Sequence, residues 1–215
     1  MKNVERHDEN SAFSAIELLV ALALLGIVAL LLLPRHIQRP SAPRINCVNN
    51  LRQVGLAFRT WALDHEDLLP MQTSITNGGT LEMVTDAKAF HHFQVLSNEL
   101  ATPKVLVCPT DRKRISAANF LTGFNNQNLS YFVGIDAAPN NPQMVLAGDR
   151  NLTNAPVRGG FMEITTNDLV SWTDDLHRKQ GNVCLADGSV QQLSSARLQE
   201  AIRFTGLATN RLAMP

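Results

Sequence analysis

The sequence predicts an α+β protein with an apolar N-terminal helix, a second amphipathic helix and a head built on an antiparallel β-sheet. Three observations support this fold class. A run that is apolar except for Ser14 and Glu17 extends from Phe13 to Leu33, apolar residues recur at helical spacing over 45–64, and short β-branched or aromatic runs bounded by turn residues fill the second half of the chain. Because the helices precede the strands instead of alternating with them, we expect the strands to pair antiparallel.

The composition excludes some classes of partner. The 215 residues carry 19 Lys and Arg against 19 Asp and Glu, so the formal net charge is zero. Non-specific binding to nucleic acid depends on a basic excess, which this chain lacks, and we expect no nucleic-acid partner. Once the apolar segment is set aside, roughly 170 residues remain, which is the size of one domain with its own core.

The apolar run is long enough to span a membrane. Its 21 residues extend about 31 Å as an α-helix, against a hydrocarbon core of roughly 30 Å, and Pro34 ends it. Glu17 lies near its start, where a charge at bilayer depth costs about 3 kcal/mol and needs a partner or a function. A secretory signal peptide is disfavoured because its apolar region is usually shorter. An ordinary single-span anchor stays open but does not explain Glu17.

Ala12, Phe13, Glu17 and Pro34, with the apolar run between them, resemble the N-terminal signature of type IV pilins and type II secretion pseudopilins. The resemblance implies that residues 1–12 are a leader, which a prepilin peptidase removes between Ala12 and Phe13. It also implies that Phe13, the new N-terminus, is then methylated on its amino group. The family usually has Gly before the cut, where this chain has Ala12.

The same resemblance gives Glu17 a role in assembly. Cleavage leaves a cationic α-amino group on Phe13, which can neutralise Glu17 of a neighbouring subunit inside a bundle of apolar helices. The segment 13–34 is then both a transmembrane and an assembly helix, with other pilin-like subunits as partners. We therefore expect a single-pass protein of the bacterial inner membrane, whose head lies in the periplasm or outside the cell.

We expect a linker at 35–44, because Pro34, Pro40 and Pro43 do not fit one continuous helix. The head then occupies 45–215 and begins with the amphipathic helix. The apolar stripe of that helix is expected to face the sheet, and a groove for a partner is the alternative. The stripe consists of Val48, Leu51, Val54 or Gly55, Phe58, and Trp61 or Ala62.

The remaining elements follow from turn residues and strand patterns. A turn-rich loop at 71–80 precedes a short helix at 88–100. Ser194 and Ser195 can cap a last short helix that ends at Phe204. The expected strands are 105–108, 129–133, 144–147, 161–165, 182–186 and 189–193, of which the last two form a C-terminal hairpin.

His177, nine further residues and then Asp187-Gly188 resemble a C-terminal element found in a group of bacterial pilin-like proteins. Sequences like Cys47–Gln53 and Cys108–Asp111 also occur in that group, so the resemblance covers most of the chain. It supplies no biochemical role for the element. The structural interpretation is that Asp187 and Gly188 adopt the positive φ angles of a tight hairpin turn, with His177 beside it.

The alternative interpretation is a cation site in which Asp187 joins Asp149, Asp111 or His177. Pseudopilins similar to this chain often hold calcium in the head, so the resemblance implies calcium as the candidate cofactor. Calcium prefers several oxygen ligands, and the sequence has no contiguous Asp-rich loop, so we assign no metal ligands. A hydrolase built from His177, Asp187 and Cys184 is disfavoured, since Cys184 lies in an apolar strand pattern typical of a buried, inert thiol.

The three cysteines have neither CxxC spacing nor a nearby pair of histidines, and they do not predict a zinc site. In an exported head, Cys47 and Cys108 can form a disulfide that ties the second helix to the first strand. Cys184 would then be left over. Two free, buried thiols are the alternative.

Together these observations favour a structural subunit over an enzyme. We expect a pilin-like protein that works by polymerisation, and among such proteins the size of the head and its lack of adhesive repeats favour a type II secretion pseudopilin. The alternative is a membrane-anchored ligand-binding or adhesive protein that uses the pilin signature only for export. That alternative predicts an exposed pocket or apolar patch on the head.

Overall fold

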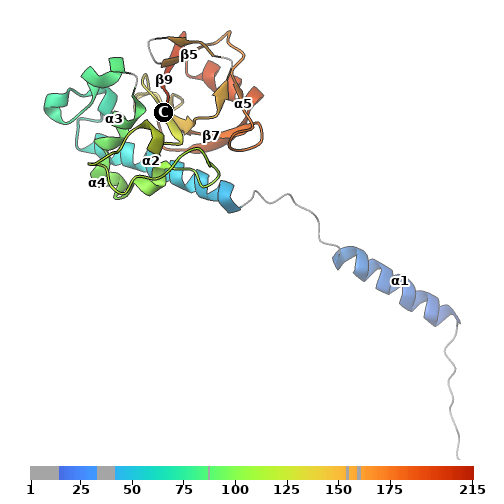
Figure 1. Ribbon diagram of the computed structural model, residues 1–215. Helices are drawn as coiled ribbons and strands as arrows, with labels where there is room; N and C mark the ends of the chain where they lie inside the picture. Colours follow the sequence, from blue (N-terminus) through green and yellow to red (C-terminus); the bar gives the residue numbers. More distant parts are fainter. Residues whose placement is uncertain (1–14, 33–41, 87, 154, 159–160) are drawn as a thin grey trace, which may run out of the picture. The chain divides into compact units, whose positions relative to one another are not determined.

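The computed structural model of the protein describes residues 15–32, 42–86, 88–153, 155–158 and 161–215. The chain divides into two compact units, Met1–Arg39 and Pro40–Pro215. The second unit is the head, and its elements confirm an α+β fold with an antiparallel sheet and several helices (Figure 1).

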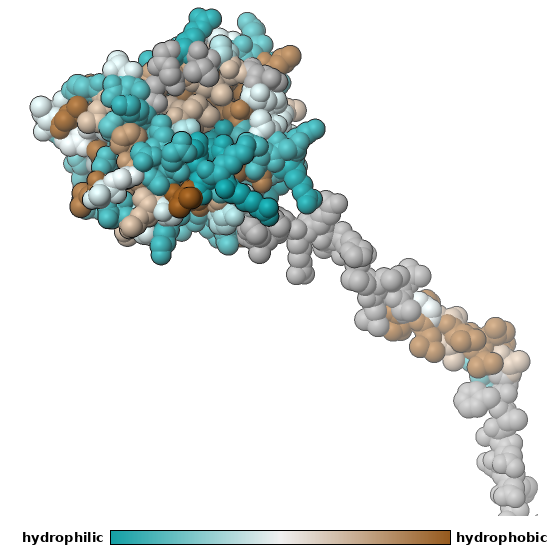
Figure 2. Space-filling view, viewed as in Figure 1, coloured by the Kyte–Doolittle hydropathy of each residue, from teal (hydrophilic) through white to brown (hydrophobic). Residues whose placement is uncertain are grey.

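The first unit contains helix α1, Ala15–Leu32, with Glu17 in its first turn. Within the described residues, no helix combines the length and the apolar character needed to cross a membrane. Apolar side chains make up the surface of α1 in Figure 2. The large ones, each at least half exposed, are Ile16, Leu18, Leu19, Val20, Leu22, Leu24, Leu25, Ile27 and Val28.

The second helix begins earlier than expected. Helix α2 spans Ala42–Leu63, so residues 42–44 of the expected linker belong to the helix, whereas 35–41 lie outside the described residues. Pro43 is tolerated there because the first turn of a helix leaves its N–H groups without intrahelical partners. The predicted apolar stripe is confirmed as buried at Val48, Leu51, Val54, Phe58, Trp61 and Ala62. Cys47, one turn before Leu51, is buried as well.

Short helices occupy the segment between α2 and the sheet. Two helices, α3 (Ala89–Gln94) and α4 (Ser97–Leu100), replace the single helix expected at 88–100. The strand expected at 105–108 is wrong, because Pro103–Leu106 forms the 3₁₀ helix η4 and its apolar residues are buried without strand pairing. The other 3₁₀ helices are η1 (Pro70–Gln72), η2 (Ile75–Asn77), η3 (Leu81–Asp86) and η5 (Asn126–Asn128).

Seven strands form one antiparallel sheet in the order β4-β5-β9-β1-β2-β7-β8, and a separate ribbon pairs β3 with β6. The last five strands expected from the sequence are confirmed as β1, β2, β5, β7 and β8. The bounds are β1 Tyr131–Gly134, β2 Val145–Asp149, β3 Leu152–Thr153, β4 Val157–Arg158, β5 Phe161–Thr165, β6 Ser171–Trp172, β7 Gln180–Leu185, β8 Val190–Ser194 and β9 Thr209–Ala213.

The sequence did not predict strand β9, which lies between β5 and β1 and joins the two halves of the sheet. It follows α5 (Ser195–Phe204), the last helix, which is confirmed with Ser194 as its N-cap. β9 pairs with β5 over five residues and with β1 over two. Asn210 and Arg211 give its short sequence little strand character, and the pairing with β5 and β1 is non-local, so no periodicity indicates it.

The sheet is covered on both faces. On one face α2, α3 and α4 lie over a core that includes Tyr131, Val133 and Cys184. On the other face α5 and the β3–β6 ribbon cover a second core that includes Phe132 and Val183. Neighbouring residues of a strand therefore alternate between the two cores, as the pleat requires. Because both faces are buried, the central strands have nearly continuous apolar sequences.

The hairpin β7–β8 is confirmed, but its turn differs from the expected one. Gly188 has a positive φ of 85°, whereas Asp187 does not. The Gly188 N–H donates to the Leu185 carbonyl at 2.9 Å, so the loop is a longer one that needs a single left-handed glycine. Helix α2 passes close to this turn: a Cβ added to Gly55 would lie 2.5 Å from Cys184 Sγ and 3.3 Å from Gly188 Cα.

Candidate functional site

A cluster of buried polar groups lies where α2, β2 and β7 meet. Buried charged and amide side chains are uncommon unless they are paired, which makes this cluster the best candidate for a functional site in the head. We call it the buried polar cluster. Its members are the Cys47–Cys108 disulfide and the side chains of Asp111, Asp149, Arg150, His177 and Asn182.

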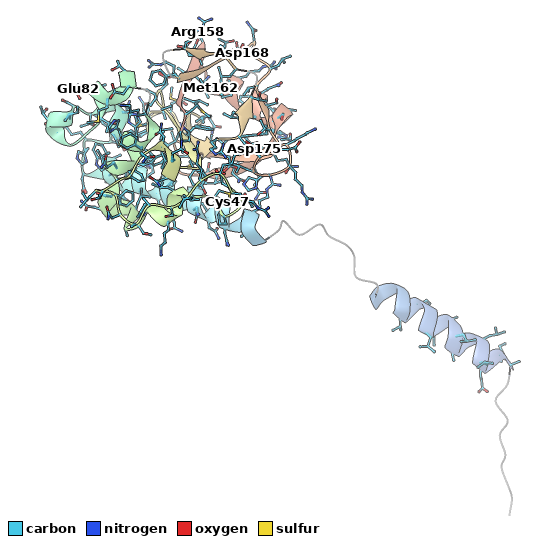
Figure 3. All side chains as sticks on the ribbon, in the orientation of Figure 1. Cys47, Glu82, Arg158, Met162, Asp168 and Asp175 are labelled. Atoms are coloured by element: carbon cyan, nitrogen blue, oxygen red, sulfur yellow. A yellow bond between two sulfur atoms is a disulfide. The ribbon has the colours of Figure 1, made fainter. Side chains whose placement is uncertain are left out.

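Segments far apart in the sequence supply these groups. Cys47 lies in the second turn of α2, close to the beginning of that helix in Figure 3. Cys108 follows η4 in a turn that the Asp111 N–H closes by donating to the Cys108 carbonyl at 2.8 Å. Asp149 is the last residue of β2, and His177 comes three residues before β7. The cluster is therefore a product of tertiary folding.

Cys47 and Cys108 form a disulfide that ties α2 to the loop after η4. Their Cα atoms are 5.0 Å apart, which is an ordinary separation for a bridge. The Thr110 Oγ1 lies 3.0 Å from Cys108 Sγ and 3.9 Å from Cys47 Sγ. The sequence left open a disulfide or two free thiols, and the structure has the disulfide. The expected bridge joined the helix to a strand, whereas the observed bridge joins it to a loop.

His177 contacts both the disulfide and Asp149. Its Nε2 lies 3.5 Å from Cys108 Sγ and 3.4 Å from Asp149 Oδ2. Burial opposes a charge on either partner: it raises the pKa of Asp149 to about 7 and lowers the pKa of His177 to about 4. At neutral pH the imidazole is therefore uncharged.

Asn182 fixes the position of the Asp149 carboxyl. The backbone N–H and the side-chain Nδ2 of Asn182 donate to Asp149 Oδ2 at 2.7 and 2.8 Å. The other carboxyl oxygen, Oδ1, is buried and has no hydrogen-bond partner among the described residues. A buried acceptor without a partner costs about 1–3 kcal/mol. This atom therefore indicates a position that can take a water, a proton or a ligand.

Asp111 and Arg150 form the second charged pair of the cluster. Arg150 donates from Nε to Asp111 Oδ2 and from Nη2 to Oδ1, both at 2.7 Å. The Ser130 hydroxyl and the Lys113 N–H donate to the same carboxylate. Burial alone would raise the pKa of Asp111, but these bonds and the charge of Arg150 hold that pKa below its ordinary value. Protein donors therefore saturate this carboxylate.

The backbone immediately after His177 is strained. Arg178 and Lys179 have left-handed φ angles of 53° and 60°, which cost a non-glycine residue about 1–2 kcal/mol each. The Lys179 N–H donates to the Thr173 carbonyl at 3.3 Å and closes the turn. This turn leads the chain into β7 while the side chain of His177 stays buried in the cluster. Strain of this kind concentrates at functional sites.

The structure separates the residues of the C-terminal element. Asp187 is exposed at the hairpin turn, where its Oδ1 accepts a hydrogen bond from the Ser189 N–H at 2.8 Å. Asn182, which binds Asp149, lies inside β7, whereas Asp187 lies in the turn two residues beyond the end of that strand at Leu185. His177 lies near the open end of the hairpin, so His177 and Asp187 do not form one site.

Cys184 also lies outside the cluster. It is a buried free thiol that packs beneath Gly55 of α2, and burial raises its pKa to about 12. Together with the position of Asp187, this means that the three residues of the disfavoured hydrolase hypothesis are not adjacent.

The cluster does not fit calcium. Calcium takes six to eight oxygen ligands, whereas Asp111 is saturated by Arg150 and its other donors, and Asn182 occupies one oxygen of Asp149. The remaining ligand atoms that the described residues place here are one nitrogen and two sulfurs. Calcium bound by other residues of the head stays a prediction.

Sequence reasoning named Asp111, Asp149 and His177 but missed Arg150 and Asn182. A signal for Arg150 was present, because Asp149-Arg150 places two charges directly after the buried run of β2. Asn182 gave no signal, since a single amide inside an apolar strand pattern does not reveal its partner. The residues of the expected processing site, Ala12 and Phe13, lie outside the described residues.

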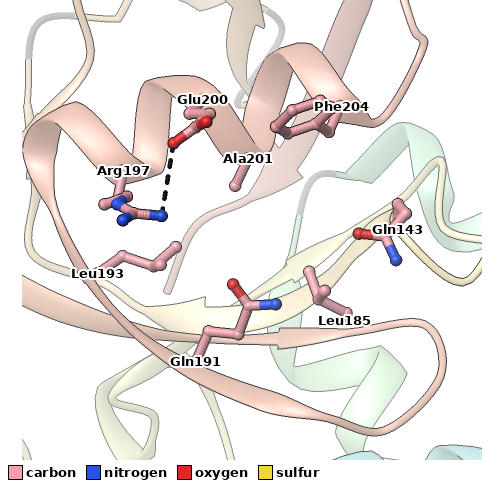
Figure 4. Close-up of a pocket in the computed structure, with 8 residues that line it drawn as sticks. All are labelled: Gln143, Leu185, Gln191, Leu193, Arg197, Glu200, Ala201 and Phe204. Atoms are coloured by element: carbon pink, nitrogen blue, oxygen red, sulfur yellow. Dashed lines mark ion pairs between the residues drawn. The ribbon is translucent and has the colours of Figure 1, made fainter.

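A separate pocket of about 230 Å³ lies between α5 and the hairpin β7–β8 (Figure 4). An ion pair of 3.8 Å between Arg197 and Glu200 borders it, and the ring of Phe204 at its rim is 66% exposed. The other lining residues are Gln143, Leu185, Gln191, Leu193 and Ala201.

The fold and the site define an α+β head with helices on both faces of an antiparallel sheet and a disulfide-centred polar cluster. Comparisons with protein-family models, curated proteins and solved structures found no match. The function is therefore argued from the residues of this chain.

Proposed function

We propose that this protein is a pilin-like structural subunit, processed by a prepilin peptidase and assembled through its N-terminal helix, and that it serves as a type II secretion pseudopilin. The observation that carries the proposal is the surface of α1. Nine large apolar side chains between Ile16 and Val28 are at least half exposed, and Glu17 is the only ionisable residue in the helix. A helix that is apolar on all sides needs a cover of lipid or protein.

The size of the exposed apolar surface supports this interpretation. Burying one fully exposed Val, Leu or Ile side chain gains about 1.5–3 kcal/mol, and these nine are 50–68% exposed, so covering them gains about 8–16 kcal/mol before any cost of ordering. A helix with this surface is stabilised by a cover of lipid or protein. Lipid and neighbouring copies of the same helix both supply the missing apolar contacts, which agrees with insertion in the bacterial inner membrane followed by lateral assembly.

In this proposal Glu17 determines how the helices of neighbouring subunits align along their length. It lies in the first turn of α1, where the free backbone N–H groups favour a negative charge. Within an apolar bundle a carboxylate also needs an opposite charge, and the amino group of a processed Phe13 on a neighbouring subunit supplies one. Subunits shifted out of register would leave Glu17 without that partner.

Mass spectrometry of the membrane-extracted protein tests the processing step. We expect a mature chain that begins at Phe13 with a methylated amino group, together with other pilin-like subunits in the same membrane fraction. A chain that keeps Met1 throughout would overturn the pilin mechanism.

Crosslinking in membranes tests the assembly step. Glu17→Ala removes the carboxylate, so we expect normal insertion but at least a tenfold loss of crosslinked neighbours, about 1.4 kcal/mol. Glu17→Asp keeps the charge in a shorter side chain and is the matched control, which we expect to crosslink more than Glu17→Ala. Wild-type crosslinking by Glu17→Ala would refute the pairing role.

The alternative function is a membrane-anchored ligand-binding or adhesive protein, and the pocket beside α5 is the observation that favours it. Its volume of about 230 Å³ is below the range of about 300–1,000 Å³ typical of small-molecule sites, which ranks this alternative second. Screening a small-molecule library against wild-type protein and Phe204→Ala distinguishes the two. A ligand whose binding requires Phe204 would favour the alternative.

A further inference from the structure

Three ligating atoms of the buried polar cluster lie unusually close together. Sγ of Cys47, Sγ of Cys108 and a ring nitrogen of His177 are all within 4.8 Å of one another. In the oxidised protein the two sulfurs are bonded to each other, so neither can bind a metal. Reduction of the bridge frees both sulfurs without requiring His177 to move toward them.

Asp149 lies beside His177 but is not one of the residues whose ligand atoms lie within 4.8 Å of one another. Its Oδ2 lies 3.4 Å from His177 Nε2, and its Oδ1 is buried without a hydrogen-bond partner among the described residues. The Asp149 side chain is 0% exposed, so an oxygen at this position has no access to bulk water. This oxygen is a second observation, independent of the cysteines, that indicates a bound ligand.

The distances within the cluster match a tetrahedral zinc ion. Zinc binds nitrogen and oxygen at about 2.0–2.2 Å and sulfur at about 2.3 Å, so its ligand atoms are separated by about 3.3–3.8 Å. The Nε2 of His177 lies 3.5 Å from Cys108 Sγ, which is within this range. The two sulfurs are bonded to each other in this structure and must move apart for both to bind the ion.

The surroundings also suit a metal site. Asn182 donates two hydrogen bonds to Asp149, and the Thr110 hydroxyl lies 3.0 Å from Cys108 Sγ, where it can donate to a thiolate. Such outer contacts orient metal ligands. Thr110 is half-buried and the neighbouring Pro109 is exposed, so this side of the cluster lies beneath a surface turn.

We propose that reduction of the Cys47–Cys108 disulfide converts the buried polar cluster into a zinc site whose protein ligands are Cys47, Cys108 and His177, with the fourth position of the ion left for water. A dithiol reductant supplies the two electrons and two protons: its own thiols become a disulfide, and the bridge becomes two thiols. Zn²⁺ then replaces the two thiol protons, which pass to solvent. In both states a covalent or coordinate link ties α2 to the loop after η4.

The test is zinc binding to the full-length protein in detergent micelles, measured by competition with a chromophoric chelator after reduction with a phosphine and its removal under argon. We expect one zinc per chain in the reduced protein, and binding at least a hundredfold weaker in the oxidised protein. This comparison needs no substitution, so a folding defect cannot obscure it. Equal affinity in the two redox states would overturn the proposal.

Two variants identify the ligands. His177→Ala should weaken zinc binding by more than about tenfold, the lower limit seen even for outer contacts of a zinc site. Cys184→Ala, which removes the cysteine outside the cluster, should bind as the wild type does. Substituting Co²⁺ adds a spectroscopic readout, because two thiolate ligands give sulfur-to-cobalt charge-transfer bands that the oxidised protein lacks. Loss of these bands in Cys184→Ala, or their survival in Cys47→Ala/Cys108→Ala, would refute the assignment.

Discussion

Removal of the Cys47–Cys108 bridge should destabilise the head by about 4 kcal/mol. The two cysteines are 61 residues apart in the sequence, and closing a loop of that size lowers the entropy of the unfolded chain by an amount worth about 4 kcal/mol at 25 °C in the chain-entropy account. The perturbation is the double substitution Cys47→Ala/Cys108→Ala. The assay is urea unfolding of the full-length protein in detergent micelles, followed by Trp fluorescence, since Trp61 and Trp172 are both buried in the head.

Reduction provides the matched comparison. Treating the wild type with a phosphine in the presence of a zinc chelator should lower its free energy of unfolding by a similar amount. The same treatment should leave the free energy of unfolding of the double variant unchanged. Cys184→Ala should respond to reduction as the wild type does, because its thiol lies outside the bridge. A loss below about 1 kcal/mol in both the reduced wild type and the double variant would refute the reasoning, since it would mean that the bridge adds no constraint beyond the packing of α2.

Three further predictions concern the interior of the head, each measured as a change in the free energy of unfolding. Gly55→Ala should destabilise the head by about 1–3 kcal/mol, because the new Cβ clashes with Cys184 Sγ. The same substitution in a Cys184→Ala background should cause a smaller loss of stability, because the sulfur is absent. Burial lowers the pKa of His92 to about 4, so the folded state binds fewer protons than the unfolded state between pH 4 and 6.5, and His92 alone should lower stability by about 3 kcal/mol on acidification through this range. His92→Gln should remove this share of the pH dependence, while His177, whose pKa is also lowered to about 4, keeps its own share. Asp111→Ala leaves the largely buried guanidinium of Arg150 without its carboxylate and should destabilise the head by about 3–5 kcal/mol. Lys113→Ala breaks an exposed ion pair with Asp175 and should destabilise it by less than about 1 kcal/mol. Equal losses in the two variants would contradict the argument that burial sets the cost.

Local patterns predicted the elements that depend on local chemistry. The stripe along α2, the cap at Ser194 and the hairpin closed by Gly188 were all visible in the sequence, because each depends on residues close together in the chain. The strand predicted at 105–108 was wrong because it relied on a local apolar pattern alone. Apolar character indicates burial, and it does not by itself distinguish a strand from a 3₁₀ helix that begins at Pro103.

The candidate site was less predictable than the fold. Asp149 and His177 were named as candidates, but with Asp187 as their partner, which the structure places at the far end of β7. The actual neighbours of His177 are Asp149 and Cys108, which come from β2 and the loop after η4. The spacing of His177, Asp149 and Cys108 along the chain did not indicate that they lie together. The order of the strands in the sheet decides which strand ends are neighbours.

The sequence by itself determined a helix over Ala15–Leu32, the amphipathic α2, five of the strands and the α+β class. Each of these follows from periodicity, capping or turn chemistry within about twenty residues. Only the tertiary structure decided that β9 lies between β5 and β1, that both faces of the sheet are covered, and that a disulfide, His177 and Asp149 meet. The physical reason is that strand pairing and core packing join residues from distant parts of the chain, and their free energy depends on the whole arrangement instead of any one segment.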